Sequence, residues 1–229
     1  MLFTQIEFFV FFAVVLATLA IVKNHRIRKR LLLLASYYFY AYWDWRFLSL
    51  ILVSTMVDYF VALGLARTTS LQGRKVLLIT SLVCNLGILG FFKYFNFFVE
   101  SLQGILDAFG LHAGTLHIVL PIGISFYTFQ TLSYTIDVYR RRLEPCRNVF
   151  DFALFVAFFP QLVAGPIVRA SEFLPQLEAN PRVGGYDVFL GFRQFTIGLF
   201  KKVFIADHIA LYVDYVFANA GAFDAVSTW

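Results

Sequence analysis

Apolar stretches that alternate with short basic clusters most strongly constrain what this chain can fold into. The first stretch, Phe8–Val22, is followed at once by five basic residues within eight positions, Lys23–Arg30. Two further stretches lie on either side of a second basic cluster within Arg67–Lys75. Only 14% of the residues are charged, roughly half the share in a typical soluble domain. This small share of charged residues cannot cover a water-facing surface. The sequence therefore predicts an integral membrane protein and excludes soluble enzyme folds and disordered chains.

The basic clusters also predict how the chain is oriented. The net charge of +5 is typical of a membrane protein rather than of a nucleic-acid-binding protein, because the basic residues lie at the ends of apolar stretches. The positive-inside rule places Lys23–Arg30 in the cytoplasm and the N-terminus outside it. We therefore expect membrane lipid as a partner and no nucleic acid. Residues 1–93 are predicted to form four regular spans: Phe8–Val22, Leu31–Tyr42, Phe47–Ala66 and Val76–Phe92.

The pattern changes after Lys93, and an amphipathic segment with a loop is predicted to follow it. All six prolines lie between Pro121 and Pro181. Non-helical backbone at membrane depth is tolerated only where protein or a water-filled cavity surrounds it. Residues 94–229 are therefore predicted to form broken, re-entrant and amphipathic helices that carry the function. The whole chain is predicted to be one all-α polytopic transmembrane bundle.

The stretch from Phe158 to Arg169 is the most informative part of this proline-containing half. Pro160 and Pro166 free backbone carbonyls from helical bonding, and Gln161 and Arg169 supply hydrogen-bond donors. One interpretation is a narrow polar passage that grips an anionic group. The other is a kinked helix with an arginine that reaches the interface. The residues alone leave both open.

Two further residues complete the candidate site. Pro121 opens the helix before this stretch, and Lys201 lies on a helix predicted within Gly185–Val216. Gln161, Arg169 and Lys201 are predicted to line or support the passage, and the three prolines to shape it. On a straight helix the spacing puts four polar residues on about one third of the circumference: Arg193, Gln194, Lys201 and His208.

Asp58 is a charge at membrane depth, eleven residues into the stretch Phe47–Ala66. It is either a proton or cation site or a carboxylate that pairs with a neighbouring helix, and the second is favoured because its own stretch holds no His, Lys or second acid. No metal site is predicted, since His112 and His117 lack a companion ligand at a suitable spacing. Cys84 and Cys146 are not expected to form a disulfide.

Six blocks of sequence, in this order, carry a resemblance to a known family: Ser36–Tyr40, Phe91–Phe97, Leu120–Gln130, Ser133–Arg140, Phe159–Arg169 and Gly198–Asp207. They resemble the membrane-bound O-acyltransferase family in its alginate-acetylating bacterial branch. The resemblance implies a multi-pass inner-membrane protein that moves an acetyl group from a cytoplasmic donor, such as an acetyl thioester, towards an extracytoplasmic polysaccharide hydroxyl. It also implies periplasmic partner proteins. No bound cofactor is expected.

The chain departs from this family in length. Family members are about twice as long, and their signature histidine lies in the second half in a Trp-His-Gly-like context. A hydroxyl acceptor needs a group that takes its proton, and histidine suits this best. The resemblance therefore assigns no catalytic residue here, places the family histidine beyond Trp229, and predicts a truncated chain that is inactive alone. None of the four histidines fits that context: His25, His112, His117 and His208.

Two other functions remain open from the residues. Discontinuous helices and buried charge also suit a transporter or flippase for an anionic or lipid-linked substrate. A non-catalytic membrane scaffold that docks partner subunits is the other alternative.

Overall fold

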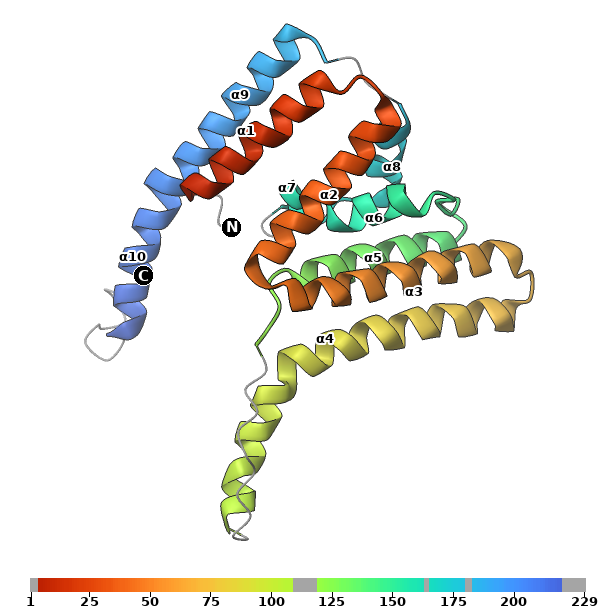
Figure 1. Ribbon diagram of the computed structural model, residues 1–229. Helices are drawn as coiled ribbons and strands as arrows, with labels where there is room; N and C mark the ends of the chain where they lie inside the picture. Colours follow the sequence, from red (N-terminus) through yellow and green to blue (C-terminus); the bar gives the residue numbers. More distant parts are fainter. Residues whose placement is uncertain (1–3, 109–118, 163–164, 180–182, 220–229) are drawn as a thin grey trace. The chain divides into compact units, whose positions relative to one another are not determined.

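The computed structural model describes residues 4–108, 119–162, 165–179 and 183–219, and all regular elements within these ranges are helices (Figure 1). The predicted all-α class is confirmed. The α-helices are α1 (Ile6–Ile21), α2 (His25–Asp44), α3 (Leu48–Arg67), α4 (Leu71–Ala108), α5 (Ile124–Tyr139), α6 (Val149–Ala157), α7 (Phe159–Leu162), α8 (Ala170–Glu178), α9 (Gly185–Phe200) and α10 (Asp207–Ala218).

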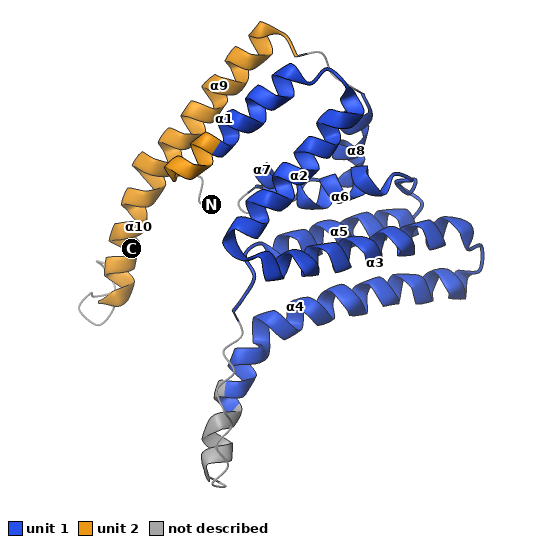
Figure 2. Ribbon diagram, in the orientation of Figure 1, with its two compact units in different colours: residues 1, 11–180 blue, residues 2–10, 181–229 orange. Residues whose placement is uncertain are grey.

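The chain divides into two compact units (Figure 2). The first unit comprises Met1 and Phe11–Asn180, and the second comprises Leu2–Val10 and Pro181–Trp229. The first unit holds most of α1 and all of α2 to α8, and it contains the helices that surround the candidate site.

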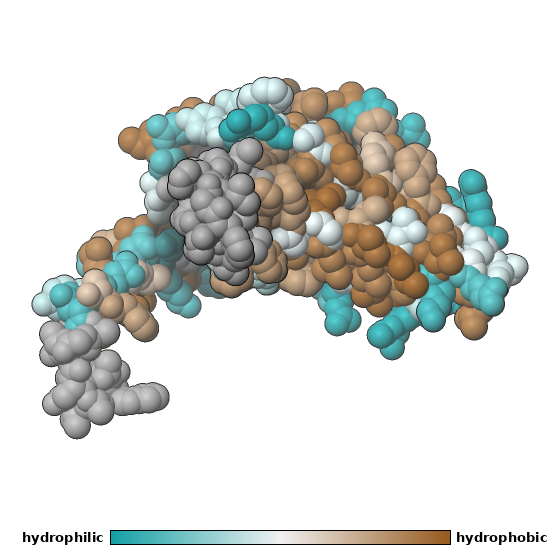
Figure 3. Space-filling view, turned by 90° about the horizontal axis from the view of Figure 1, so that it is seen from below, coloured by the Kyte–Doolittle hydropathy of each residue, from teal (hydrophilic) through white to brown (hydrophobic). Residues whose placement is uncertain are grey.

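Two helical runs are long and apolar enough to cross a membrane. One is His25–Arg67, in which a single 3₁₀ turn joins α2 to α3, and the other is Leu71–Val99 within α4. Ile6–Ile21 and Val149–Leu162 are shorter apolar segments. Hydrophobic side chains also cover broad areas of the surface (Figure 3), as expected for helices that face lipid. The number of spans and the cytoplasmic orientation stay predictions.

Asp44 and Arg46 make the turn between α2 and α3. The Asp44 carboxylate accepts a hydrogen bond from the Arg46 backbone N–H at 2.9 Å and pairs with the Arg46 guanidinium at 2.6 Å. A short polar side chain that caps the next turn in this way lets the chain reverse without leaving its N–H groups unpaired.

Helix α4 continues past Lys93, where the sequence predicted the span to stop. It is unbroken from Leu71 to Ala108, because this stretch contains no proline and lysine is a good helix former. A charge that ends an apolar span therefore does not end the helix. His112 and His117 lie outside the described residues.

A buried polar network joins α3, α4 and α5, which lie side by side in Figure 1. Asp58 on α3 is fully buried. Its carboxylate accepts hydrogen bonds from Ser81 Oγ at 2.5 Å and Asn85 Nδ2 at 3.0 Å, both on α4, and from Thr135 Oγ1 on α5 at 3.2 Å. Asn85 in turn accepts a hydrogen bond from Ser54 Oγ. These donors are neutral, so the structure supports the interpretation in which Asp58 ties neighbouring helices together.

A buried arginine holds one end of the same three helices. Arg74, near the start of α4, is 7% exposed. Its guanidinium donates to the Leu65 carbonyl near the end of α3 and to the Tyr139 carbonyl at the end of α5, the latter at 2.6 Å. It also lies 5.6 Å from the centroid of the Tyr139 ring. Carbonyls at helix C-termini carry partial negative charge, so they compensate a cation that has no carboxylate among these contacts.

Two tyrosines hold the loop between α5 and α6 against the helices. The Tyr134 hydroxyl accepts a hydrogen bond from the Cys146 backbone N–H at 2.9 Å, and the Tyr59 hydroxyl donates to the Arg147 carbonyl at 2.7 Å. Burial raises the pKa of the Cys146 thiol, which makes its reactive thiolate scarce at neutral pH. Cys84 and Cys146 are both free, as predicted.

The Asp58 network predicts a contrast between two substitutions. Asp58→Asn keeps an oxygen that accepts hydrogen bonds, whereas Asp58→Leu leaves the buried donors of Ser81 and Thr135 unpaired. We expect Asp58→Leu to lower the free energy of unfolding by about 2 kcal/mol or more and Asp58→Asn to lower it much less. The difference in stability between the two variants is measured by thermal unfolding in detergent, with size-exclusion chromatography to monitor the folded fraction. Equal losses would mean that the charge of Asp58, rather than its hydrogen bonds, holds the helices.

Candidate functional site at the broken helices

Helices α6 and α7 are two pieces of one apolar segment that breaks at Phe158. Phe158 has φ −55° and ψ 108°, outside the helical range, and Pro160 has no backbone N–H to donate. In an unbroken helix the Phe159 N–H would bond to the Phe155 carbonyl. It donates instead to Ser36 Oγ on α2, at 3.2 Å. The prediction of a broken segment here is confirmed.

Two glutamines replace the donor that the Phe155 carbonyl loses at this break. Gln130 Nε2 on α5 donates to it at 2.7 Å and Gln161 Nε2 on α7 at 3.0 Å. Both side chains are buried. The structure therefore places Gln161 inside the break, where it binds backbone. Gln130 was not singled out from the sequence, although an amide within a largely apolar helix was a signal that could have found it.

The start of α5 packs against the end of α7. Gly123 has a left-handed φ of 78°, and a Cβ atom at this position would lie 2.8 Å from the Leu162 carbonyl oxygen. Tyr40 on α2 donates its hydroxyl to the Ile122 carbonyl at 3.1 Å. Pro121, just before, is buried. The two proline-containing breaks that the sequence singled out are therefore in contact.

Tyr127 lies one turn after Gly123 on the same face of α5. Its side chain is 1% exposed, and its hydroxyl has no hydrogen-bond partner in the part of the chain that the structure describes. A buried hydroxyl without a partner costs about 1–3 kcal/mol, so such groups commonly bind water or a ligand. This hydroxyl is thus a buried polar group without a protein partner in the described residues, one turn away from the contact of Gly123 with Leu162.

The remaining predicted residues of the first unit are exposed. Pro160 and Pro166 lie at its surface, and so does Arg169. The Arg169 backbone carbonyl accepts hydrogen bonds from the N–H groups of Glu172 and Phe173 and so begins α8. The structure thus buries Gln161 and leaves the Arg169 side chain exposed.

Lys201 belongs to the second unit, where it is exposed and begins the π-helical segment Lys201–Ala206 between α9 and α10. A π turn holds one extra residue, which rotates the following residues by about 100° relative to a straight helix. The predicted polar stripe from Arg193 to His208 assumed regular α-helical spacing, and the π-helical segment shifts His208 relative to Arg193, Gln194 and Lys201. The His208 ring stacks on Phe204, with 6.2 Å between the ring centroids.

Gly123→Ala tests the contact between the two breaks. The added methyl group meets backbone rather than a flexible side chain, and alanine is strained at a positive φ, so we expect a loss of about 1–3 kcal/mol in the free energy of unfolding. Gly87→Ala on α4 is the matched control, since a Cβ atom there has nothing within 4 Å, and it should be neutral or stabilising. Chemical or thermal unfolding of both variants in detergent compares them. A tolerated Gly123→Ala would contradict the packing of α5 on α7.

Curated relatives match nearly all of the chain. It is 43% identical over 222 residues to the probable alginate O-acetylase AlgI of Pseudomonas putida, a match that covers 95% of this chain and 45% of the relative. It is 43% identical over 221 residues to the probable alginate O-acetylase AlgI of Pseudomonas aeruginosa, a match that covers 95% of this chain and 42% of the relative. The peptidoglycan O-acetyltransferase of Helicobacter pylori is 38% identical over 236 residues, a match that covers 92% of this chain and 44% of the relative.

No protein-family model and no solved structure matches the chain. The chain spans about half the length of the curated relatives it matches. The resemblance that six blocks of sequence carried thus extends over almost every residue. Over 95% of its length the chain is thus similar to about half of a relative named probable alginate O-acetylase, and over 92% of its length to about half of a relative named peptidoglycan O-acetyltransferase.

Proposed function

We propose that this chain is the N-terminal half of a membrane O-acetyltransferase that moves an acetyl group from a cytoplasmic donor to an extracytoplasmic polysaccharide hydroxyl. The observation that carries the proposal is 43% identity over 95% of the chain to a protein named for alginate O-acetylation. A second relative is named for peptidoglycan O-acetylation. Both named acceptors are polymers that contain sugars, so a carbohydrate hydroxyl is the acceptor class on which these names agree.

The broken helices are the feature that favours a passage for the acetyl group in this proposal. Backbone that leaves a helix at membrane depth has to be satisfied by protein groups, and the amides of Gln130 and Gln161 do this at Phe155. In this proposal Gln161 supports the wall of the passage, and the buried Tyr127 hydroxyl is a polar group within that wall. Pro121, Pro160 and Pro166 shape the passage. Arg169, which is exposed within the first unit, lines it together with residues outside this chain. The role predicted for Lys201, which belongs to the second unit, stays a prediction.

The base that takes the hydroxyl proton is proposed to lie outside this chain. The acceptor needs such a group within hydrogen-bond reach in the complex with substrate. His25 binds the Leu177 carbonyl at 2.7 Å through Nε2, and His208 binds the Val203 carbonyl at 3.1 Å through Nδ1. Both contacts are to backbone of the same chain, and neither histidine adjoins the broken helices in sequence. A cytoplasmic donor such as an acetyl thioester, a bacterial inner-membrane location and periplasmic partner proteins complete the proposal.

A chimera tests this function. The chain replaces the matching half of the Pseudomonas aeruginosa relative in a strain that lacks that protein, and the acetyl ester content of the secreted polysaccharide is measured. We expect the chimera to restore acetyl esters and the 229-residue chain alone to restore none, because the base and the rest of the site are supplied by the other half. A chimera that reaches the membrane at the normal level, folds, and yields no acetyl ester would overturn the proposal. So would acetylation by the chain alone.

Arg169→Lys in the same chimera tests the gripping role of this residue. Lysine keeps the positive charge but loses the planar fork that binds an anion through two hydrogen bonds. We expect acetylation to fall about tenfold or more. Arg142→Lys, at another exposed position in the loop between α5 and α6, is the control and should leave acetylation unchanged. Equal activity of the two variants would remove Arg169 from the passage.

A further inference from the structure

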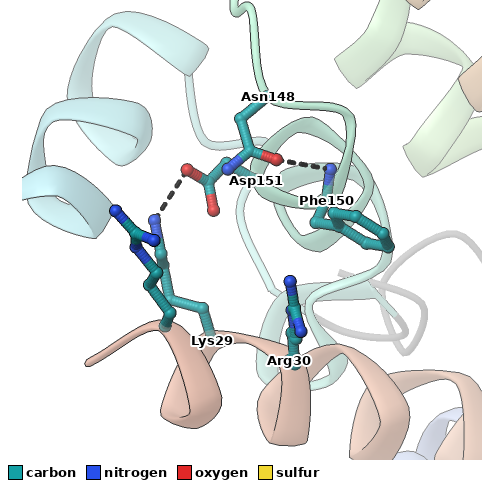
Figure 4. A pocket seen from close by; sticks show the side chains of 6 residues that line it. Lys29, Arg30, Asn148, Phe150 and Asp151 are labelled. Carbon is teal, nitrogen blue, oxygen red and sulfur yellow. Dashed lines mark hydrogen bonds and ion pairs between the residues drawn. The ribbon is translucent and has the colours of Figure 1, made fainter. Parts of the chain in front are cut away.

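A basic pocket lies between the start of α2 and the start of α6, at the other end of α6 from the break at Phe158 (Figure 4). Its volume is about 100 Å³. A pocket of this volume has room for a group of a few heavy atoms. Six residues line it: Arg26, Lys29, Arg30, Asn148, Phe150 and Asp151.

The charges in this pocket do not balance. Lys29 Nζ pairs with Asp151 Oδ2 at 2.7 Å, and both side chains are largely buried. Neither Arg26 nor Arg30 has a carboxylate within ion-pair distance in the described ranges of the chain. Three cationic side chains against one carboxylate leave two positive charges uncompensated, and both are guanidinium groups. The pocket is therefore built to accept an anion.

The geometry favours a phosphate group. The Arg30 guanidinium lies 5.5 Å from the centroid of the Phe150 ring, an attraction that holds the planar fork in place without neutralising it. Asn148 caps α6 by accepting the Phe150 N–H at 3.0 Å, so the positive end of that nine-residue helix faces the same region. Arginine forks match the tetrahedral oxygens of phosphate through paired hydrogen bonds.

The surroundings point to a lipid as the source of the phosphate. Arg26, Arg30 and Leu34 follow one another at intervals of four residues, so they form one stripe along α2. Leu34 is 64% exposed, and Phe150 beside the pocket is 51% exposed. Along α2 the cationic side chains are thus followed by exposed apolar side chains, in the same order as the headgroup and acyl chains of a phospholipid. Basic pockets at the cytoplasmic ends of membrane helices bind anionic headgroups.

We propose that this pocket binds the phosphate of an anionic phospholipid headgroup in the cytoplasmic leaflet. The bound phosphate joins α2 to the start of α6, the helix whose other end breaks at Phe158. The lipid therefore acts as a structural ligand that holds the first half of the broken segment against α2. This binding does not depend on acetyl transfer, so it is tested apart from that activity.

The experiment measures lipid binding by the purified 229-residue chain in neutral detergent, using native mass spectrometry and the midpoint of thermal unfolding. Phosphatidylglycerol is the test lipid, phosphatidylcholine is the lipid without net charge, and inorganic phosphate is the soluble source. The double variant Arg26→Gln/Arg30→Gln removes the free guanidinium groups. The double variant Lys23→Gln/Arg28→Gln is the matched control, because it removes the same charge from the same basic cluster at residues that do not line the pocket.

We expect phosphatidylglycerol to bind and to raise the midpoint, and its affinity to fall about tenfold or more in Arg26→Gln/Arg30→Gln while changing little in the control. Equal losses in both variants would mean general attraction to a basic surface and would overturn the site. Equal binding of phosphatidylcholine, or stabilisation by inorganic phosphate alone, would overturn the anionic lipid as its ligand. If Arg26→Gln/Arg30→Gln does not fold, Arg30→Lys keeps the charge but loses the fork, and it should weaken binding several-fold. Unchanged binding in Arg30→Lys would then reject the proposal.

Discussion

The first unit depends on the satisfaction of backbone polar groups where the apolar segment 149–162 leaves the helix. In an apolar environment an unpaired carbonyl or N–H costs several kcal/mol, of the order of 2–7, so a break can persist only where other groups replace the lost bonds. Ser36 supplies the acceptor for the Phe159 N–H, and two glutamine amides supply donors to the Phe155 carbonyl. The packing of α2, α5 and α7 around this point follows from that requirement.

Local patterns were enough to predict much of this fold. Each of the first four apolar stretches lies, to within one residue, inside one of α1 to α4, because a run of apolar residues with no proline has few alternatives to a helix in a membrane. The break at Phe158 was also predictable, since proline removes a donor wherever it lies. Asp58 could be placed between helices from its cost at membrane depth alone.

The sequence could not identify partners that are distant along the chain. Ser36 and Phe159 are 123 residues apart, and Gln130 and Phe155 are 25 apart, so nothing near either residue indicates the pairing. The π-helical segment at Lys201 holds a single extra residue per turn, which the composition does not reveal, and it shifts His208 relative to the other residues of the predicted stripe. Arg74 resembles an ordinary residue of a cytoplasmic loop until the ends of α3 and α5 are seen around it.

The contacts of Arg74 also connect helices that are synthesised at different times. Its guanidinium binds a carbonyl of α3, which is synthesised just before it, and a carbonyl of α5, which is synthesised 65 residues later. Without α5, the Arg74 guanidinium would keep only the Leu65 carbonyl of these two partners. The buried position of this cation between α3 and α4 therefore depends on a helix that lies much later in the sequence.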